Sequence, residues 1–189
     1  MGGASERRPP RRADAVRNRA AILAAAEAVF AERGPAASTE EVARRASVAV
    51  GTVFRHFPTK RDLLVAILKA LLARLDAEAR QLAADDPATG LFRFFRTVVD
   101  EAAARTTVLA LLRPTGDVRA GHALASLQEP IAELLRQGQQ AGSVRPDLGI
   151  AEVIALLTSV TEGALAGGWD VPLRDQVLRV VTDGLSGPG

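Results

Sequence analysis

Residues 38–60 read STEEVARRASVAVGTVFRHFPTK, and this stretch decides the fold of the N-terminal third of the chain. Ser38 and Glu41 have the S-x-x-E spacing of a capping box, which predicts that a helix begins at Thr39. Apolar side chains then recur at helical spacing, so this short helix has one face suited to burial. The run Ser47–Val50 is predicted to form the turn that follows it.

A second short helix is predicted over residues 51–57. Pro58 ends it, because proline lacks a backbone N–H and disfavours helix for the residue before it. Two short helices joined by so tight a turn are typical of a helix-turn-helix, whose second helix enters the major groove of DNA. The sequence therefore predicts a DNA-binding head.

The charge of the chain is unevenly distributed. Residues 1–61 contain 12 Lys+Arg and 6 Asp+Glu, a net +6, whereas residues 62–189 contain 12 and 16, a net −4. A basic head on an acidic body is typical of a protein that binds a polyanion at one end. A solvated charge run is the alternative for the arginines between positions 7 and 19, but the helix-turn-helix behind them favours nucleic acid. Residues 1–12 are predicted to be a disordered basic arm.

The rest of the chain is predicted to be helical. Apolar side chains recur at helical spacing and no stretch sustains the period-two alternation of a strand, so we expect no sheet. Pro130 falls inside one predicted helix and is expected to kink or divide it. The result is an all-α fold of about nine helices, which includes, besides the two short helices, residues 14–33, 60–84, 87–105, 108–112, 117–141, 150–166 and 173–185.

Composition argues against an enzyme. Cys and Tyr are absent, and the two His residues lie 66 positions apart. No nucleophile elbow, phosphate-binding glycine loop, dinucleotide fingerprint or H-E-x-x-H motif occurs. The sequence predicts no catalytic residue, no metal site and no cofactor. No apolar run approaches the roughly 18 residues needed to span a bilayer, so we expect a cytoplasmic protein that does not enter a membrane.

The segment Ile22–Leu64 resembles the DNA-binding domain of TetR-type transcriptional regulators, on the strings ILAAAEAVFAERG, STEEVARRASV and VGTVFRHFPTKRDLL. Two positions depart from the family: Ser47 stands where Gly is usual, and Phe54 stands where a Tyr hydroxyl often meets a phosphate. The resemblance implies a helix-turn-helix domain over residues 13–59 and a ligand-binding and dimerisation domain over residues 60–189. It also implies a homodimeric repressor that a small apolar effector releases from a palindromic double-stranded DNA operator.

The resemblance also assigns the DNA contacts. Arg55 is the candidate for direct readout, because its fork can hold guanine O6 and N7 together, with a phosphate contact as the alternative. Val50 and Thr52 are candidates for thymine methyl groups, and Thr39 for a phosphate at the start of its helix. Phe54 and Phe57 are expected in the core of the head. The predicted DNA-binding residues are Thr39, Arg44, Val50, Gly51, Thr52, Arg55, His56 and Lys60.

The body is less informative, because packing is the default role for its apolar side chains. The resemblance implies an effector pocket, whose candidate residues are Phe92, Phe95, Val99, His122, Thr158, Thr161, Glu162 and Trp169. It also implies a dimer interface from the last two helices, with candidates Val153, Leu156, Leu157, Val160, Val177, Leu178 and Val181. The alternative function is a helical small-molecule or partner-binding protein that does not use its DNA-binding head.

Overall fold

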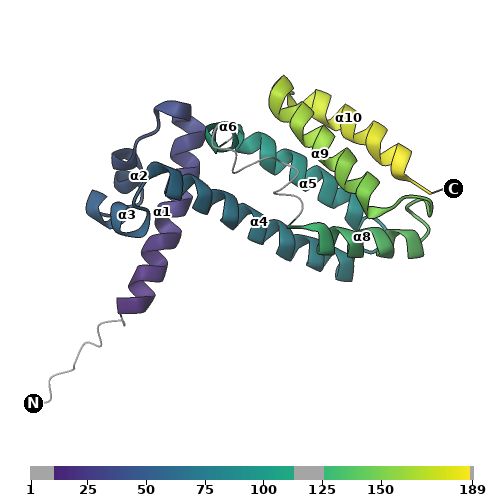
Figure 1. Cartoon of the computed structure of the whole chain (residues 1–189), viewed down its shortest axis with the longest axis horizontal. Coiled ribbons are helices and arrows are strands. Elements are labelled where there is room, and N and C mark those ends of the chain that lie inside the picture. Colours follow the sequence, from purple (N-terminus) through teal and green to yellow (C-terminus); the bar gives the residue numbers. More distant parts are fainter. Residues whose placement is uncertain (1–10, 113–125, 188–189) are drawn as a thin grey trace, which may run out of the picture. The chain divides into compact units, whose positions relative to one another are not determined.

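The computed structural model describes residues 11–112 and 126–187, and this part of the chain contains nine α-helices and no strand, as predicted (Figure 1). The chain divides into two compact units, Met1–Ile67 and Leu68–Gly189. In the first unit the helices are α1 (Arg11–Arg33), the 3-10 helix η1 (Gly34–Ala36), α2 (Thr39–Arg45), α3 (Val50–His56) and the start of α4 (Lys60–Asp85).

A side-chain cap accounts for the start of α2 in this first unit, which we call the head. The Ser38 hydroxyl accepts a hydrogen bond from the Glu41 backbone N–H at 3.1 Å, so α2 begins at Thr39 as predicted. Helix α3 ends at His56, and the backbone of the next residue, Phe57, is extended. The core of the head is formed by buried apolar residues of all four helices: Ile22, Ala26, Val29, Phe30, Val42, Ala43, Val53, Phe57, Leu63, Leu64 and Ile67.

The second unit, the body, contains the rest of α4 and five further described helices. These are α5 (Gly90–Ala104), α6 (Thr106–Leu112), α8 (Gln128–Gln140), α9 (Ile150–Gly167) and α10 (Val171–Leu185). Helix α5 contacts α6, α8, α9 and α10, and Figure 1 shows it running through the body between its neighbours. Phe94 and Phe95 of α5 are completely buried, which makes α5 the centre of this core.

Some helix boundaries differ from the sequence prediction. The helix predicted over residues 117–141 has its described part from Gln128 onward, preceded by a turn at 126–127. Pro130 therefore lies in the first turn of α8, where a missing N–H removes no helical hydrogen bond. Helix α10 begins at Val171, two residues earlier than expected, because the Asp170 carboxylate accepts from the Leu173 N–H at 3.0 Å.

Trp169, the single tryptophan, packs against the last turns of α9. A Cβ on Gly163 would lie 2.9 Å from Cζ2 of the indole, and a Cβ on Gly167 would meet the indole nitrogen. Gly168 closes the helix in the left-handed conformation, with φ of 57°. Because Gly163 and Gly167 have no side chains, α9 has a notch at these positions, and the Trp169 indole lies in it.

The turn between α2 and α3 contains a left-handed residue that is not glycine. Ser47 has φ of 55°. Its backbone N–H donates to Arg44 O at 3.2 Å, and the next N–H, of Val48, donates to Ala43 O at 3.0 Å. These bonds close the C-terminus of α2 and set the direction in which the chain enters α3. Ser47 therefore has a left-handed backbone conformation that is sterically unfavourable for a residue with a Cβ.

We expect Ser47→Gly to raise the free energy of unfolding by about 0.5–1 kcal/mol, since the relief of left-handed strain exceeds the added backbone entropy. Urea denaturation followed by far-UV circular dichroism measures the change. Ser47→Ala is the control, because it keeps a Cβ in the same backbone conformation and should bring no gain. An equal gain in both variants would show that the hydroxyl, rather than the torsion, limits stability.

Candidate DNA-binding surface

Helix α3 has a buried face and an exposed face. Val53 is completely buried and anchors the inner face, and α3 contacts α2, which in turn contacts α1. The exposed face carries Val50, Gly51, Phe54 and Arg55. Three of the predicted DNA-binding residues, Val50, Gly51 and Arg55, are therefore brought together on one surface.

The exposure of Phe54 contradicts one prediction from the sequence. Phe54 was expected in the core with Phe57, but its exposed fraction is 42%, whereas that of Phe57 is 3%. The phase of the helix explains the difference, because Phe54 directly follows the buried Val53 and cannot share its direction. The exposed aromatic side chain on α3 is thus a surface residue that the sequence prediction assigned to the interior.

Thr52 and His56 lie at the flank of α3 and are half-buried. The imidazole of His56 is 6.3 Å from the Phe57 ring, measured between ring centroids. The Arg19 guanidinium of α1 lies over the Phe57 ring, 5.3 Å from its centroid. Phe57 thus anchors the end of α3 and leaves His56 at the edge of the exposed face.

On α2, Thr39 and Arg44 have different surroundings. The Thr39 hydroxyl lies 3.5 Å from the Glu40 carboxylate. The pKa of Glu40 is lowered, first by a hydrogen bond from the backbone N–H of Glu40 itself and then by a hydrogen bond from the Ser38 hydroxyl. Glu40 is therefore charged at neutral pH, and a phosphate at Thr39 requires this carboxylate to turn outward. Arg44, whose side chain is 76% exposed, makes a 3.5 Å contact with Glu41 and is free to turn toward an anion.

The neighbouring Arg45 has a structural role. Its Nη1 donates to both carboxylate oxygens of Glu32 on α1, at 2.6 and 2.7 Å. Arg33 of α1 donates through Nε to Glu41 at 3.0 Å. These two pairs connect α1 to α2 at the surface and leave Arg44 as the outward cation of α2.

The Lys60 side chain makes its contacts within the head. Its ammonium donates to Pro35 O at 3.1 Å and to Ala37 O at 2.8 Å, and it lies 5.3 Å from the centroid of the Phe30 ring. The ammonium thereby connects the start of α4 to the loop that precedes α2. An ammonium has three N–H groups, so a phosphate contact, which stays a prediction, would use the third.

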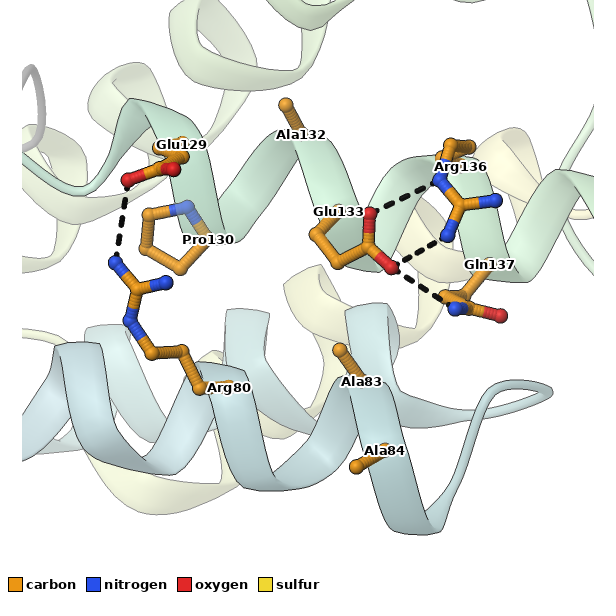
Figure 2. Close-up of a pocket in the computed structure, with 9 residues that line it drawn as sticks. All are labelled: Arg80, Ala83, Ala84, Glu129, Pro130, Ala132, Glu133, Arg136 and Gln137. Carbon is orange, nitrogen blue, oxygen red and sulfur yellow. Dashed lines mark hydrogen bonds and ion pairs between the residues drawn. The ribbon is translucent and has the colours of Figure 1, made fainter.

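The body contains a groove between α4 and α8, with a volume of about 740 Å³ (Figure 2). Figure 2 shows its charged side chains paired with one another: Arg80 with Glu129 at 3.2 Å, and Glu133 with Arg136 at 2.5 Å. Arg136 and then Gln137 lower the pKa of Glu133 to about 2, so the carboxylate stays charged at physiological pH. This lining suits water better than an apolar effector. The lining residues are Arg80, Ala83, Ala84, Glu129, Pro130, Ala132, Glu133, Arg136 and Gln137.

The residues predicted to line an effector pocket are dispersed within the body. Phe95 and Val99 are completely buried in α5. Phe92 lines a second hollow of about 430 Å³, together with Arg93 and Arg96. Thr158, Glu162 and Trp169 are half-buried, and His122 lies outside the described residues. Thr161 of α9 is 4% exposed, and its hydroxyl has no hydrogen-bond partner among the described residues.

The residues predicted for the dimer interface divide into two groups. Val153, Leu157, Val160 and Leu178 are buried within the core of their own chain. Leu156, Val177 and Val181 are half-buried, and Val171, Leu173 and Val180 of α10 are exposed. The surface available to a partner is therefore the outer face of α10 with the half-buried side chains beside it.

Helix α9 is longer and more apolar than predicted from the sequence. Its 18 residues have a mean hydropathy of 1.4, which by length and composition alone is enough to cross a membrane. It carries Glu152 and Glu162, and it packs against α5 and α8 within the body. Only 28% of its residues are buried within the single chain, so much of this apolar helix is left uncovered.

Comparison with known proteins covers both units. Residues 22–67 match the bacterial regulatory proteins of the tetR family, and residues 86–187 match the C-terminal domain of SbtR-like transcriptional regulators. The crystal structure of a TetR transcription regulatory protein from Mycobacterium vanbaalenii is similar with a TM-score of 0.74. It shares 40% sequence identity, and the match covers 94% of this chain and 99% of that one.

Curated relatives give the same picture. The HTH-type transcriptional regulator UidR of Escherichia coli is 28% identical over 163 residues, which is 78% of this chain and 80% of that protein. An HTH-type transcriptional repressor of Mycobacterium tuberculosis is 54% identical over 57 residues. The chain spans only 30% of the length of this mycobacterial relative in that match.

We expect Lys60→Met to lower the free energy of unfolding by about 1–2 kcal/mol, because two carbonyl groups lose a charged donor while the apolar stem is kept. Urea denaturation gives the value. The matched control is Lys69→Met, which removes the other lysine of the chain from an exposed position on α4. Equal stability of the two variants would mean that the internal contacts of Lys60 contribute nothing.

Proposed function

The chain belongs to the TetR family of transcriptional regulators, and from this premise we propose that it is a homodimeric repressor of transcription. In this proposal two heads bind a palindromic DNA operator in the cytoplasm, and a small apolar effector in the body releases them. The observation that carries it is the exposed face of α3, on which Arg55 stands beside Gly51 and two apolar side chains.

Arg55 supports the proposed DNA binding because its side chain is exposed and free to make a contact. It is exposed in the last turn of α3, and among the described residues it has no hydrogen-bond or ion-pair partner. A guanidinium fork without an internal partner can hold guanine O6 and N7 in the major groove. Gly51, one turn earlier, has open space where a Cβ would stand, so the backbone of α3 can approach the DNA closely.

The uncovered apolar surface of the last two helices supports a dimer. Leu173, Val177 and Val180 follow one another at helical spacing along α10, and much of the apolar helix α9 is left uncovered by its own chain. A two-fold operator requires a two-fold protein, because each recognition helix reads one half-site. A second copy placed against these helices would bury this surface and pair the heads.

Helix α4 supports coupling between the effector and the DNA. Its first turns, to Ile67, belong to the head, and Leu71, Leu75 and Leu82 belong to the core of the body. An effector that repacks this core would therefore act on a helix whose beginning lies in the head. Release of DNA then follows only if the effector prefers the arrangement that fits DNA badly.

Fluorescence anisotropy of the purified full chain on DNA from upstream of its own gene, against random DNA across a salt series, tests the proposal. Tight, salt-sensitive binding that prefers the upstream DNA is the expected result. Absence of binding to any DNA at low salt would contradict the proposal and favour a helical protein that binds a small molecule or a partner without using its head.

We expect Arg55→Ala to lower affinity for the operator by about 10- to 100-fold while affinity for random DNA falls much less, because a bidentate base contact is lost. Arg44→Ala is the comparison. As a phosphate contact on α2, it should weaken both DNAs alike and reduce the slope of log affinity against log salt by about one. Equal losses on both DNAs for Arg55→Ala would contradict its assignment to base readout.

For the dimer, we expect Val180→Glu to shift the protein toward monomer in sedimentation velocity, because Val180 is 68% exposed on α10 and a charge there opposes burial against a second copy. Val16→Glu makes the same change at an equally exposed valine of α1 (65%) and should leave the association unchanged. A dimer as strong as that of the unmodified chain would exclude this face of α10 as the interface.

A further inference from the structure

The exposed face of α3 has an apolar edge and a cationic edge. At about 100° per residue, Val50, Phe54, Gly51 and Arg55 follow one another in that order around about 140° of the helix. Val50 and Phe54 are four residues apart and therefore adjacent along the helix, and their exposed fractions are 36% and 42%. We call this pair the apolar ridge of α3.

The core of the head is complete without the ridge. Val53 and Phe57 fill the inner side of α3, at 0% and 3% exposure. A single exposed apolar residue is ordinary, whereas two adjacent ones that the core does not use leave an apolar surface available to a partner. The open space at Gly51 lies beside them, so nothing on the helix holds a partner away from the ridge.

The charge around the ridge indicates what kind of partner this is. Helix α3 carries no acidic residue, and Arg55 and His56 follow Phe54 directly. The segment 1–61 has 12 Lys+Arg against 6 Asp+Glu. An apolar ridge inside a basic surface fits a polyanion that also presents an apolar group. Duplex DNA presents one in the major groove, the 5-methyl group of thymine.

We propose that the apolar ridge recognises the 5-methyl group of a pyrimidine in each operator half-site, with Phe54 as the main contact and Val50 beside it. Phe54 has no hydroxyl, so its contribution to DNA binding is van der Waals contact. Thr52, half-buried at the flank of α3, lies outside the ridge. The inference rests on the proposed function, and it adds a methyl-bearing pyrimidine next to the base that Arg55 contacts.

The experiment begins with selection of binding sites from random DNA by the full-length protein. In the selected duplex, each thymine is then replaced in turn by deoxyuridine, which lacks only the methyl group and keeps every hydrogen-bonding atom. Anisotropy measures affinity for each duplex. We expect one thymine in each half-site to be sensitive, with an affinity loss of about fourfold per methyl group.

Variants assign the methyl contact to a residue. Phe54→Ala should lose most of the discrimination between the thymine and deoxyuridine duplexes, because the main contact with the methyl group is gone, whereas Phe54→Leu should keep a larger part of it. Val16→Ala, at an exposed valine of α1, should discriminate as the unmodified chain does. Since Phe54 is a surface residue, Phe54→Ala should fold, and its circular dichroism spectrum is the check.

The outcomes separate this inference from the proposed function. If no DNA sequence is enriched, the proposed function itself fails. If a site is enriched but every deoxyuridine duplex binds as tightly as the original, the protein reads DNA without the methyl group and the inference is wrong. Sensitivity to deoxyuridine that persists in Phe54→Ala would assign the methyl contact to another residue. Unchanged operator affinity of Phe54→Ala would mean that the ridge serves a partner other than DNA.

Discussion

The surface that α3 presents depends on one backbone torsion, the positive φ of Ser47. The inner faces of α2 and α3 both reach one small core, and the chain between them turns through the left-handed Ser47. With that torsion in place, Val53 enters the core, and Phe54 and Arg55 are turned outward. The exposed chemistry of the head thus follows from a constraint that lies outside α3 itself.

Local signals predicted the start of α2 at Thr39 and the end of α3 to within one residue, whereas α1 and α3 begin three residues and one residue earlier than predicted. The Ser38 cap and the stop at Pro58 act between near neighbours in the chain, so the sequence contains them directly. The placement of Phe54 in the core was wrong, because a helix of seven residues has too few positions for periodicity to distinguish its faces. The contacts of Lys60 join residues 23 and 25 positions apart, which no local pattern reveals.

In the body, periodicity predicted the helices but not the use of their apolar residues. Leu156 and Leu157 are adjacent leucines of α9, yet Leu157 is completely buried in its own chain and Leu156 is half-buried at the surface. The packing of α9 on α5 and α8 separates them. A pocket is harder still to predict, because a cavity depends on the side chains of several helices at once.

The notch of Gly163 and Gly167 restricts how this chain can change during evolution. A side chain at either glycine would occupy the space of the Trp169 indole, so substitutions at these positions are coupled to position 169. Among homologues, larger residues at 163 or 167 should therefore accompany a smaller residue in place of the tryptophan. Positions 163, 167 and 169 would then vary together.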